Sequence, residues 1–161
     1  MTGFDAALSS DVYKVFHPAA GHPDIVRTYE NFTNRSGKHS NVPNNTHVVN
    51  LGWQFLIKKH LIERWNETFF RLPVEDVVER YQMITSSILG YTVDASHLKR
   101  LHALGYLPLQ IKSYPEGTLV PYGVASATFE TTVDGFEWLA GLLETVISQE
   151  VWPIQTSATT S

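Results

Sequence analysis

Cysteine is absent from the 161-residue chain. Its absence excludes disulfide bonds, thiolate nucleophiles and cysteine-ligated zinc sites. Charged side chains are also scarce, because Asp, Glu, Lys and Arg make up 17% of the residues, against about 25% in an average soluble domain. A surface with few charges exposes more apolar area, so we expect a partner to cover part of it.

An excess of positive charge is missing as well. The chain has 12 Lys and Arg against 16 Asp and Glu, a net charge of −4, which argues against a nucleic-acid-binding role. No apolar run approaches the roughly 18 residues that cross a bilayer. The first residues show no basic start followed by an apolar stretch, as a signal peptide has. We therefore expect a cytoplasmic protein without nucleic-acid or membrane partners.

The common catalytic signatures do not occur. The sequence has no GxGxxG, P-loop, HExxH or GxSxG motif. His97 and His102 are five residues apart, which does not place them on one helix face as a pair of metal ligands. The neighbouring carboxylates Glu75 and Asp76 fit a solvated helix surface better than an acid–base pair. We therefore predict that the chain binds no metal by itself.

What is present is enough apolar material for one core, with 43% hydrophobic and 12% aromatic residues in a length typical of one domain. The beginning of the chain predicts a short helix near 12–16, capped by Ser10 or Asp11 and ended by Pro18 and Gly21. Residues 25–33 are rich in β-branched and aromatic side chains and predict a strand. A polar loop follows over 34–45.

Apolar residues at helical spacing then predict three helices. They span 48–65, from Pro73 to a stop at Gly90, and from Asp94 or Ser96 to Gly105.

The pattern then changes to strands over 107–113 and 119–129, joined by a tight turn at 114–117. Pro121 and Gly123 make the second strand irregular. A last helix is expected over 135–150. Five helices with a few strands and no regular βαβ alternation predict the α+β class.

Two polar segments stand out as candidate sites. Asp11-Val12-Tyr13-Lys14 places an aromatic ring beside an acid and a base. Residues 31–38 end a strand in hydroxyls, Arg35 and Lys38, which can aim several donors at a phosphate. From the residues alone, an ordinary capped helix and an ordinary polar strand end are the better explanations, because polar strand ends are common.

Five ordered blocks resemble the N-terminal part of nicotinamide phosphoribosyltransferases. They are Asp11-x-Tyr13-Lys14, Tyr29-x-x-Phe32-x-x-Arg35-Ser36 with a helix beginning near Gly52, Tyr114-Pro115-Glu116-Gly117-x-x-x-Pro121-x-Gly123, Trp138-Leu139 with Glu144-Thr145, and Trp152-Pro153-Ile154. The similarity runs over nearly the whole chain in the same order and with similar spacing.

The resemblance implies a fold and a reaction. The fold is the N-terminal domain of a type II phosphoribosyltransferase, an α+β unit with a small mixed or antiparallel sheet and four to five helices. It would occupy 1–161, with a core over 8–150 and a truncated connection over 151–161. The family joins nicotinamide to 5-phosphoribosyl 1-pyrophosphate, giving nicotinamide mononucleotide and pyrophosphate in NAD salvage.

The resemblance also implies roles for single residues. Tyr13 matches a tyrosine that stacks on the nicotinamide ring across the interface of a homodimer, and Asp11 matches the acid beside it. Arg35 matches an arginine that contacts phosphate across the same interface. Lys14 and Lys38 are further candidates for substrate binding. The complete enzyme is expected to use Mg²⁺.

The family's catalytic barrel, with its Asp-Phe-Gly-x-Arg-Gly segment, is not in this sequence. We therefore expect the isolated chain to be inactive and to need a barrel-bearing partner chain. One alternative is a non-catalytic module that binds or modulates a full-length homologue. Another is a nicotinate-using relative, because residues outside this chain select between acid and amide.

Overall fold

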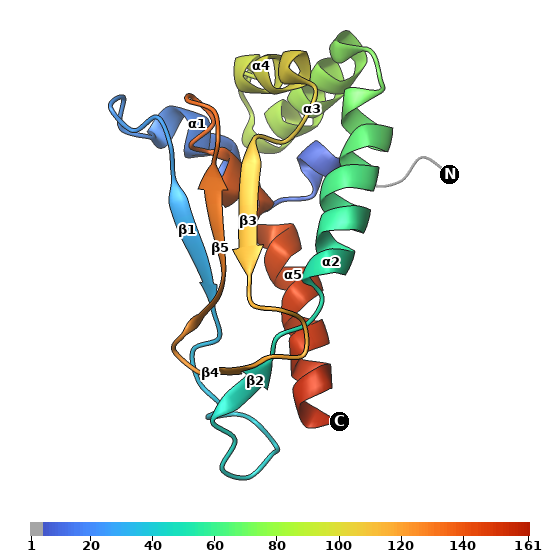
Figure 1. Ribbon diagram of the computed structural model, residues 1–161. Helices are drawn as coiled ribbons and strands as arrows, with labels where there is room; N and C mark the ends of the chain where they lie inside the picture. Colours follow the sequence, from blue (N-terminus) through green and yellow to red (C-terminus); the bar gives the residue numbers. More distant parts are fainter. Residues whose placement is uncertain (1–4) are drawn as a thin grey trace.

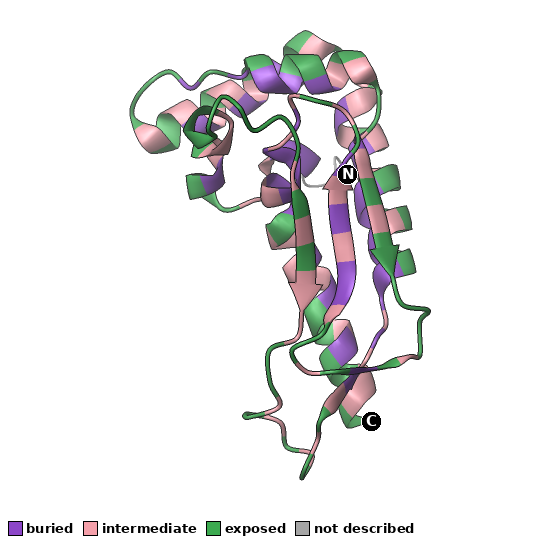
Figure 2. Ribbon diagram, turned by 60° about the vertical axis from the view of Figure 1, so that its left-hand side comes forward, coloured by how far each residue is buried: buried purple, intermediate pink, exposed green. Residues whose placement is uncertain are grey.

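A three-stranded antiparallel sheet forms the centre of the protein in the computed structural model, which describes residues 5–161. The strand order is β1 (Tyr29–Thr33), β5 (Ala125–Thr131), β3 (Leu109–Ser113). β5 has no exposed residue, whereas the edge strands β1 and β3 are only partly covered (Figure 2). A second, two-stranded sheet pairs β2 (His47–Val49) with β4 (Leu119–Pro121).

Helices cover one face and one end of this sheet (Figure 1). A long helix begins at Trp53 and ends at Phe70; its first turn is α-helical and most of the remainder is wound as a π-helix. The helical elements are η1 (Ala6–Leu8), η2 (Val12–Phe16), α1 (His17–Ala20), α2 (Trp53–Phe55), η3 (Leu56–Arg64), η4 (Asn66–Phe70), α3 (Val74–Leu89), α4 (Ser96–Leu104) and α5 (Leu139–Thr160). The predicted α+β class and antiparallel pairing are confirmed.

One hydrophobic core joins the sheet to the helices. Trp53 lies between Phe32 of β1 and Phe129 of β5, with ring centroids 5.3 and 5.8 Å apart. Further along the same helix, Trp65 packs edge-on against Phe69 at 5.1 Å. The predicted apolar face of this helix is therefore the face that is buried.

The N-terminal segment differs from its predicted form. Residues 12–16 form a tight 3₁₀ turn, and Pro18 lies inside α1, which ends at Gly21. Asp11 precedes the turn but makes no capping hydrogen bond with its side chain. The Ser10 hydroxyl instead donates to the Leu142 carbonyl, at 3.0 Å. Tertiary partners on α5 therefore replaced the local cap that the sequence predicted.

The predicted strand over 119–129 is two strands in different sheets. β4 ends at Pro121, and Gly123 adopts a φ of +81° before β5 begins. Proline lacks the amide that a ladder needs, and glycine tolerates positive φ, so the chain leaves one sheet and enters the other here. Residues 48 and 49, predicted as helical, pair with β4 as part of β2.

The end of the chain departs most from its prediction. Residues 151–160, expected as a connection after a helix ending near 150, continue α5 as regular helix through Pro153. Proline usually breaks a helix, but here Val151 and Gln155 are fully buried on both sides of it. Gly52, with φ +99°, admits the Ile154 side chain, which would lie 3.1 Å from any Cβ at that position. Packing therefore outweighs the missing hydrogen bond.

Candidate functional site

Tyr13 is displayed on the surface by η2. Its side chain is 57% exposed, and its ring meets the His17 ring edge-on at 6.2 Å. His17 in turn packs against α5 at Gly141, where a Cβ would lie 2.7 Å from the histidine Nδ1. The small residue on α5 therefore lets the turn approach closely, while the remaining surface of the Tyr13 ring stays open to a ligand or partner.

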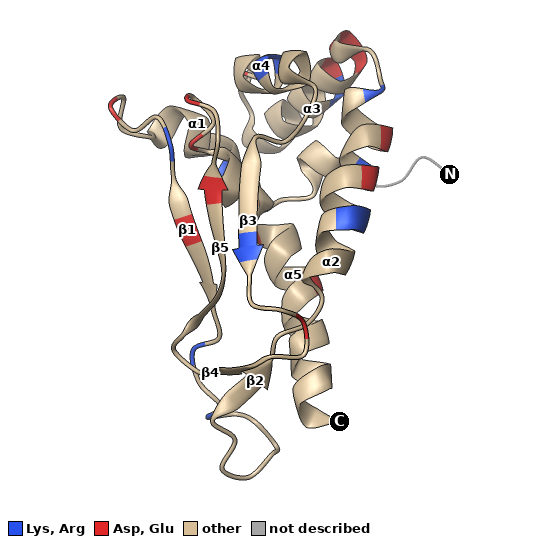
Figure 3. Cartoon of the chain, viewed as in Figure 1, with Lys and Arg blue, Asp and Glu red and all other residues tan. Residues whose placement is uncertain are grey.

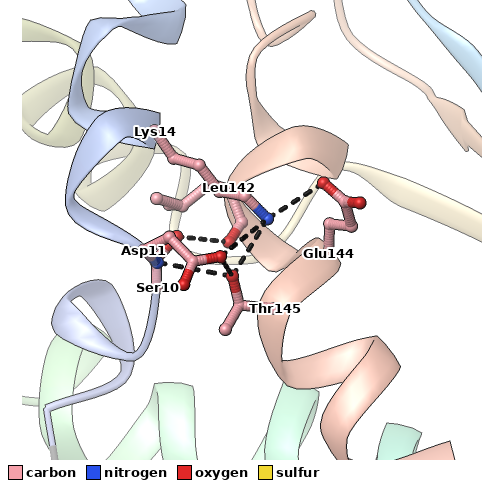
Figure 4. A network of polar contacts seen from close by, with 6 residues as sticks. All are labelled: Ser10, Asp11, Lys14, Leu142, Glu144 and Thr145. Atoms are coloured by element: carbon pink, nitrogen blue, oxygen red, sulfur yellow. Dashed lines mark hydrogen bonds and ion pairs between the residues drawn. The ribbon is translucent and has the colours of Figure 1, made fainter. Parts of the chain in front are cut away.

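Lys14 connects this turn to α5 (Figure 4). Its side chain is only 1% exposed, and its ammonium lies 2.9 Å from Glu144 Oε2 and 3.7 Å from Asp11 Oδ2. It also donates to Thr145 Oγ1 at 2.9 Å, and that hydroxyl donates to Asp11 Oδ2 at 2.7 Å. The Lys14 charge is therefore engaged within the chain, and these contacts favour a role in holding Asp11 and Tyr13 in place.

Glu30 of β1 connects this network to the sheet. Burial raises the pKa of its carboxyl, the nearby charge of Glu144 raises it further, and Lys14 lowers it. Three carboxylates, those of Asp11, Glu30 and Glu144, thus share the field of one buried ammonium. The ion pairs that hold the Tyr13 turn join Lys14 to Asp11 and to Glu144 of α5, and Glu30 of β1 lies within their electrostatic field.

Arg35 lies at the other end of β1, in a cavity of about 670 Å³. Arg35 and His39 are the ionisable side chains there other than Tyr122, and no carboxylate contributes to the wall; hydroxyl and amide groups supply most of the remaining polar lining. The lining residues are Phe32, Thr33, Asn34, Arg35, Ser36, Gly37, His39, Ser40, Asn41, Val48, Tyr122, Ser148, Trp152, Thr156, Thr159 and Thr160. Such a lining suits an oxyanion, because donors face it without an opposing negative charge.

Lys38 is exposed in the same loop but is not part of the cavity wall. In Figure 3 the loop after β1 shows blue and no red, whereas the C-terminal part of α5 shows neither colour, because residues 31–49 have no Asp or Glu and residues 151–161 have no charged side chain. Lys38 therefore adds to a locally positive field around Arg35.

One face of α5 connects the two ends of the site. Thr145, Ser148, Trp152, Thr156 and Thr159 follow one another at spacings of three and four residues, so they lie along one side of the helix. Thr145 contacts the Tyr13 turn and the others line the Arg35 cavity. From residue 145 to residue 156 a helix rises about 16 Å. The chain thus places Tyr13 and Arg35 on one surface without bringing them into contact.

Sequence reasoning missed the contribution of α5. Glu144 and Thr145 stood out only as part of a resemblance, and Thr156 and Thr159 were assigned to a connection. The detectable signal was the row of hydroxyl residues at helical spacing, obscured by Pro153. The turn at 114–117 was predicted, but its Glu116 has a structural role, accepting the Gly52 and Gln54 amides at 3.1 and 3.0 Å to cap α2.

Comparison with known proteins shows what the chain is similar to. The chain is 39% identical over 152 residues to the nicotinamide phosphoribosyltransferase of Acinetobacter baylyi, an alignment that covers 92% of this chain and 30% of that protein. The resemblance to nicotinamide phosphoribosyltransferases is confirmed. The chain therefore spans less than a third of the length of this relative. No protein-family model matches it.

The fold also recurs in a solved structure. The crystal structure of human nicotinic acid phosphoribosyltransferase aligns with 93% of this chain at a TM-score of 0.61 and 21% identity, and the chain covers 26% of that structure. At this identity the likeness establishes the fold. None of the helices over 5–161 is both long and apolar enough to cross a bilayer, and these residues contain no cluster of three or more His, Asp or Glu arranged to hold a metal ion.

Proposed function

We propose that the chain supplies part of the active site of a nicotinamide phosphoribosyltransferase. The reaction joins nicotinamide to 5-phosphoribosyl 1-pyrophosphate and releases pyrophosphate. The observation that carries the proposal is the 39% identity to such an enzyme over 92% of this chain. Because only 30% of that relative is covered, the remaining catalytic groups are assigned to residues outside these 161.

The Arg35 end suits the leaving group of this reaction. Breaking the bond between the ribose C1 and oxygen places positive charge on the sugar and negative charge on the departing pyrophosphate. A guanidinium can bind two phosphate oxygens at once, and hydroxyl donors from the loop and α5 can bind others. Donors that are already in place where charge develops stabilise the transition state without reorganising. Lys38 is proposed to strengthen this field from its exposed position.

The Tyr13 end suits a flat, neutral pyridine ring. Stacking on an aromatic side chain holds such a ring and orients its nitrogen toward the sugar. The Lys14 ammonium lies 5.8 Å from the Tyr13 ring centroid and 3.7 Å from Asp11, so both predicted nicotinamide contacts are held by one residue. We therefore assign ring stacking to Tyr13, a polar contact to Asp11 and positioning to Lys14.

Mg²⁺ is expected in the complete enzyme but does not fit this part of it. Magnesium prefers carboxylate oxygens and octahedral geometry, and the Arg35 cavity has no carboxylate in its wall. No step on this chain is therefore assigned to the metal.

A homodimer with barrel-bearing chains is part of the proposal. Over residues 5–161, the aromatic neighbour of Tyr13 is His17 at its edge, so a stacked clamp requires a second ring from elsewhere. Tyr13 and Arg35 both lie on the outside of the unit, where a neighbouring subunit can receive them. Exposed apolar side chains near them, including Val12 and Trp152, add surface for such a contact.

Reconstitution tests the proposal. The purified chain is incubated with nicotinamide and 5-phosphoribosyl 1-pyrophosphate, alone and after mixing with a polypeptide that carries the rest of the Acinetobacter baylyi enzyme. We expect nicotinamide mononucleotide only in the mixture, and at least tenfold less of it with Arg35→Ala, because a charge-assisted phosphate contact is lost. A parallel assay with nicotinate tests the choice between amide and acid.

The outcomes separate the alternatives. Turnover by the chain alone would contradict the need for a partner. The mixture could also form no nicotinamide mononucleotide. If the chain then alters the activity of the intact Acinetobacter baylyi enzyme, the result would favour a non-catalytic module that modulates a full-length homologue. Because the missing residues are added in trans, the test does not depend on which polypeptide carries them in the cell.

A further inference from the structure

A series of hydrogen-bonded side-chain amides leads from the core to Asn34, the residue before Arg35. Asn50 and Gln155 are both fully buried, and each is hydrogen-bonded to the other. The Gln155 amide donates to Asn50 Oδ1 at 3.2 Å, and Gln155 Oε1 accepts from Asn34 Nδ2 at 2.8 Å. Asn34 also accepts the Gly123 amide on its backbone carbonyl at 2.8 Å. The start of the Arg35 loop is thus tied to α5 and to the turn before β5.

Trp53 determines which amide groups donate and which accept in this series of hydrogen bonds. Its indole nitrogen donates to Asn50 Oδ1 at 2.7 Å, and an indole can only donate. Asn50 must therefore present its oxygen to Trp53 and to Gln155, and its own amide group donates to the Tyr114 carbonyl at 2.7 Å. Gln155 consequently offers an oxygen, so Asn34 has to supply a donor. A buried tryptophan in the core sets the orientation of a side chain in the cavity wall.

We propose that Gln155, oriented by Asn50 and Trp53, is a positioning residue that holds the Arg35 loop in its anion-binding form. This inference rests on the proposed function and assigns no contact with substrate to Gln155. Burying unpaired amides is costly, but a fully hydrogen-bonded network is rigid and admits one arrangement. Rigidity in the loop reduces the ordering entropy that an oxyanion ligand would otherwise have to offset.

Substitutions that break different links test this role. Gln155→Met keeps a similar length while removing both amide contacts, and Asn34→Ala removes the last link from a half-buried position that leaves the core intact. Gln149→Met is the matched control, since Gln149 is an exposed glutamine of the same helix, lies outside the cavity wall and forms no side-chain hydrogen bond within residues 5–161. Backbone amide NMR spectra of residues 35–40 report the loop without any ligand. Calorimetry with inorganic pyrophosphate measures the affinity of the cavity for this anion.

We expect Gln155→Met and Asn34→Ala to shift and broaden the loop amides, and to weaken pyrophosphate binding about three- to tenfold, whereas Gln149→Met leaves both nearly unchanged. In the reconstituted enzyme, the KM for 5-phosphoribosyl 1-pyrophosphate should rise by a similar factor while the KM for nicotinamide stays constant. A purely structural residue would lower stability without separating the two KM values.

Unchanged loop amides in both variants would overturn the inference, as would equal effects from Gln149→Met. If the unmodified chain fails to bind pyrophosphate, that result counts against the anion site of the proposed function. The loop spectra then decide the positioning role by themselves. If Gln155→Met does not fold, Asn34→Ala carries the same test from outside the core.

Discussion

The two ends of the candidate site are held by different chemistry. The Tyr13 turn is fixed by charges, because the buried Lys14 ammonium binds Glu144 and Asp11 at the surface of α5. The Arg35 loop is fixed by neutral amides, through Gln155 and Asn34. Both ends depend on the same helix face, yet they should respond to different perturbations. One helix therefore supports both ends of the candidate site through different interactions.

The difference follows from burial. Glu144 has 60% of its side chain exposed, so salt and solvent screen its pairing with Lys14. Gln155 and Asn50 are shielded from solvent, where hydrogen bonds are stronger and an unsatisfied group is expensive. We expect the contacts of the charged end to weaken one at a time. The buried amide hydrogen bonds should instead form or break together.

The largest effect of acid on stability is expected outside both ends of the site. His97 is buried beside the rings of Tyr81 and Trp138, and burial lowers its pKa to about 4, with Arg100 lowering it and Asp94 opposing. The imidazole stays neutral in the folded protein, whereas the unfolded chain takes up a proton below the ordinary value of 6.5. The contribution of His97 to the free energy of unfolding should therefore be constant above pH 6.5 and fall as the pH drops toward 4.

The expected loss for His97 is about 3 kcal/mol of unfolding free energy across that window. Urea unfolding at several pH values measures it, and His97→Phe should remove this part of the slope. His22→Gln, at an exposed position, is the control and should leave the slope intact. Glu30, whose pKa is raised, contributes in the opposite direction near its own pKa, so the difference between protein and variant is the quantity to compare. An unaltered slope in His97→Phe would place the acid sensitivity elsewhere, with the charged end as the next candidate.

Removing the Lys14 charge should separate the two ends directly. Lys14→Met keeps most of the buried aliphatic stem and deletes the contacts with Glu144 and Thr145, at a cost of about 1–2 kcal/mol in unfolding free energy. High salt should reduce this cost, since one partner is solvated. The matched control is Lys59→Met, which breaks an exposed pair with Glu63 and should cost less than about 0.5 kcal/mol.

Binding should follow the same division in Lys14→Met. We expect weaker nicotinamide binding in the reconstituted enzyme and unchanged pyrophosphate binding. Equal losses at both ends would show that α5 couples them, and would contradict independent positioning.

Much of the fold could be predicted from the sequence because its signals are local. The helix from Val74 to Leu89 ends at Gly90 with a φ of +78°, as its glycine stop predicts. The extension of α5 beyond residue 150 could not be predicted, because Pro153 is a local breaker. The helix continues because Ile154 packs against Gly52, which is about a hundred residues away in the sequence. A local sequence pattern does not contain such a contact.

The sequence named candidate site residues, which stay predictions, but it did not show which contacts hold them in place. Tyr13 and Arg35 came from a resemblance, and their exposure agrees with a role at an interface while leaving that role a prediction. Lys14 was expected to bind substrate, but its side chain faces α5, a direction that depends on tertiary contacts. Gln155 carried no signal at all, because a lone glutamine in an apolar segment has no distinctive pattern.

The smallest expected effect is the loss of the Tyr13 ring. Tyr13→Ala removes one stacking surface, so the Kd of the reconstituted enzyme for nicotinamide should rise by about two- to thirteenfold, which corresponds to roughly 0.5–1.5 kcal/mol. Stability of the chain should hardly change, because the ring is mostly exposed. Tyr29→Ala, an exposed tyrosine on β1, is the control and should leave nicotinamide binding as it is. If nicotinamide binds Tyr13→Ala as tightly as the unmodified protein, the turn held by Lys14 is not part of the nicotinamide site, and the comparison between the two ends loses its functional meaning.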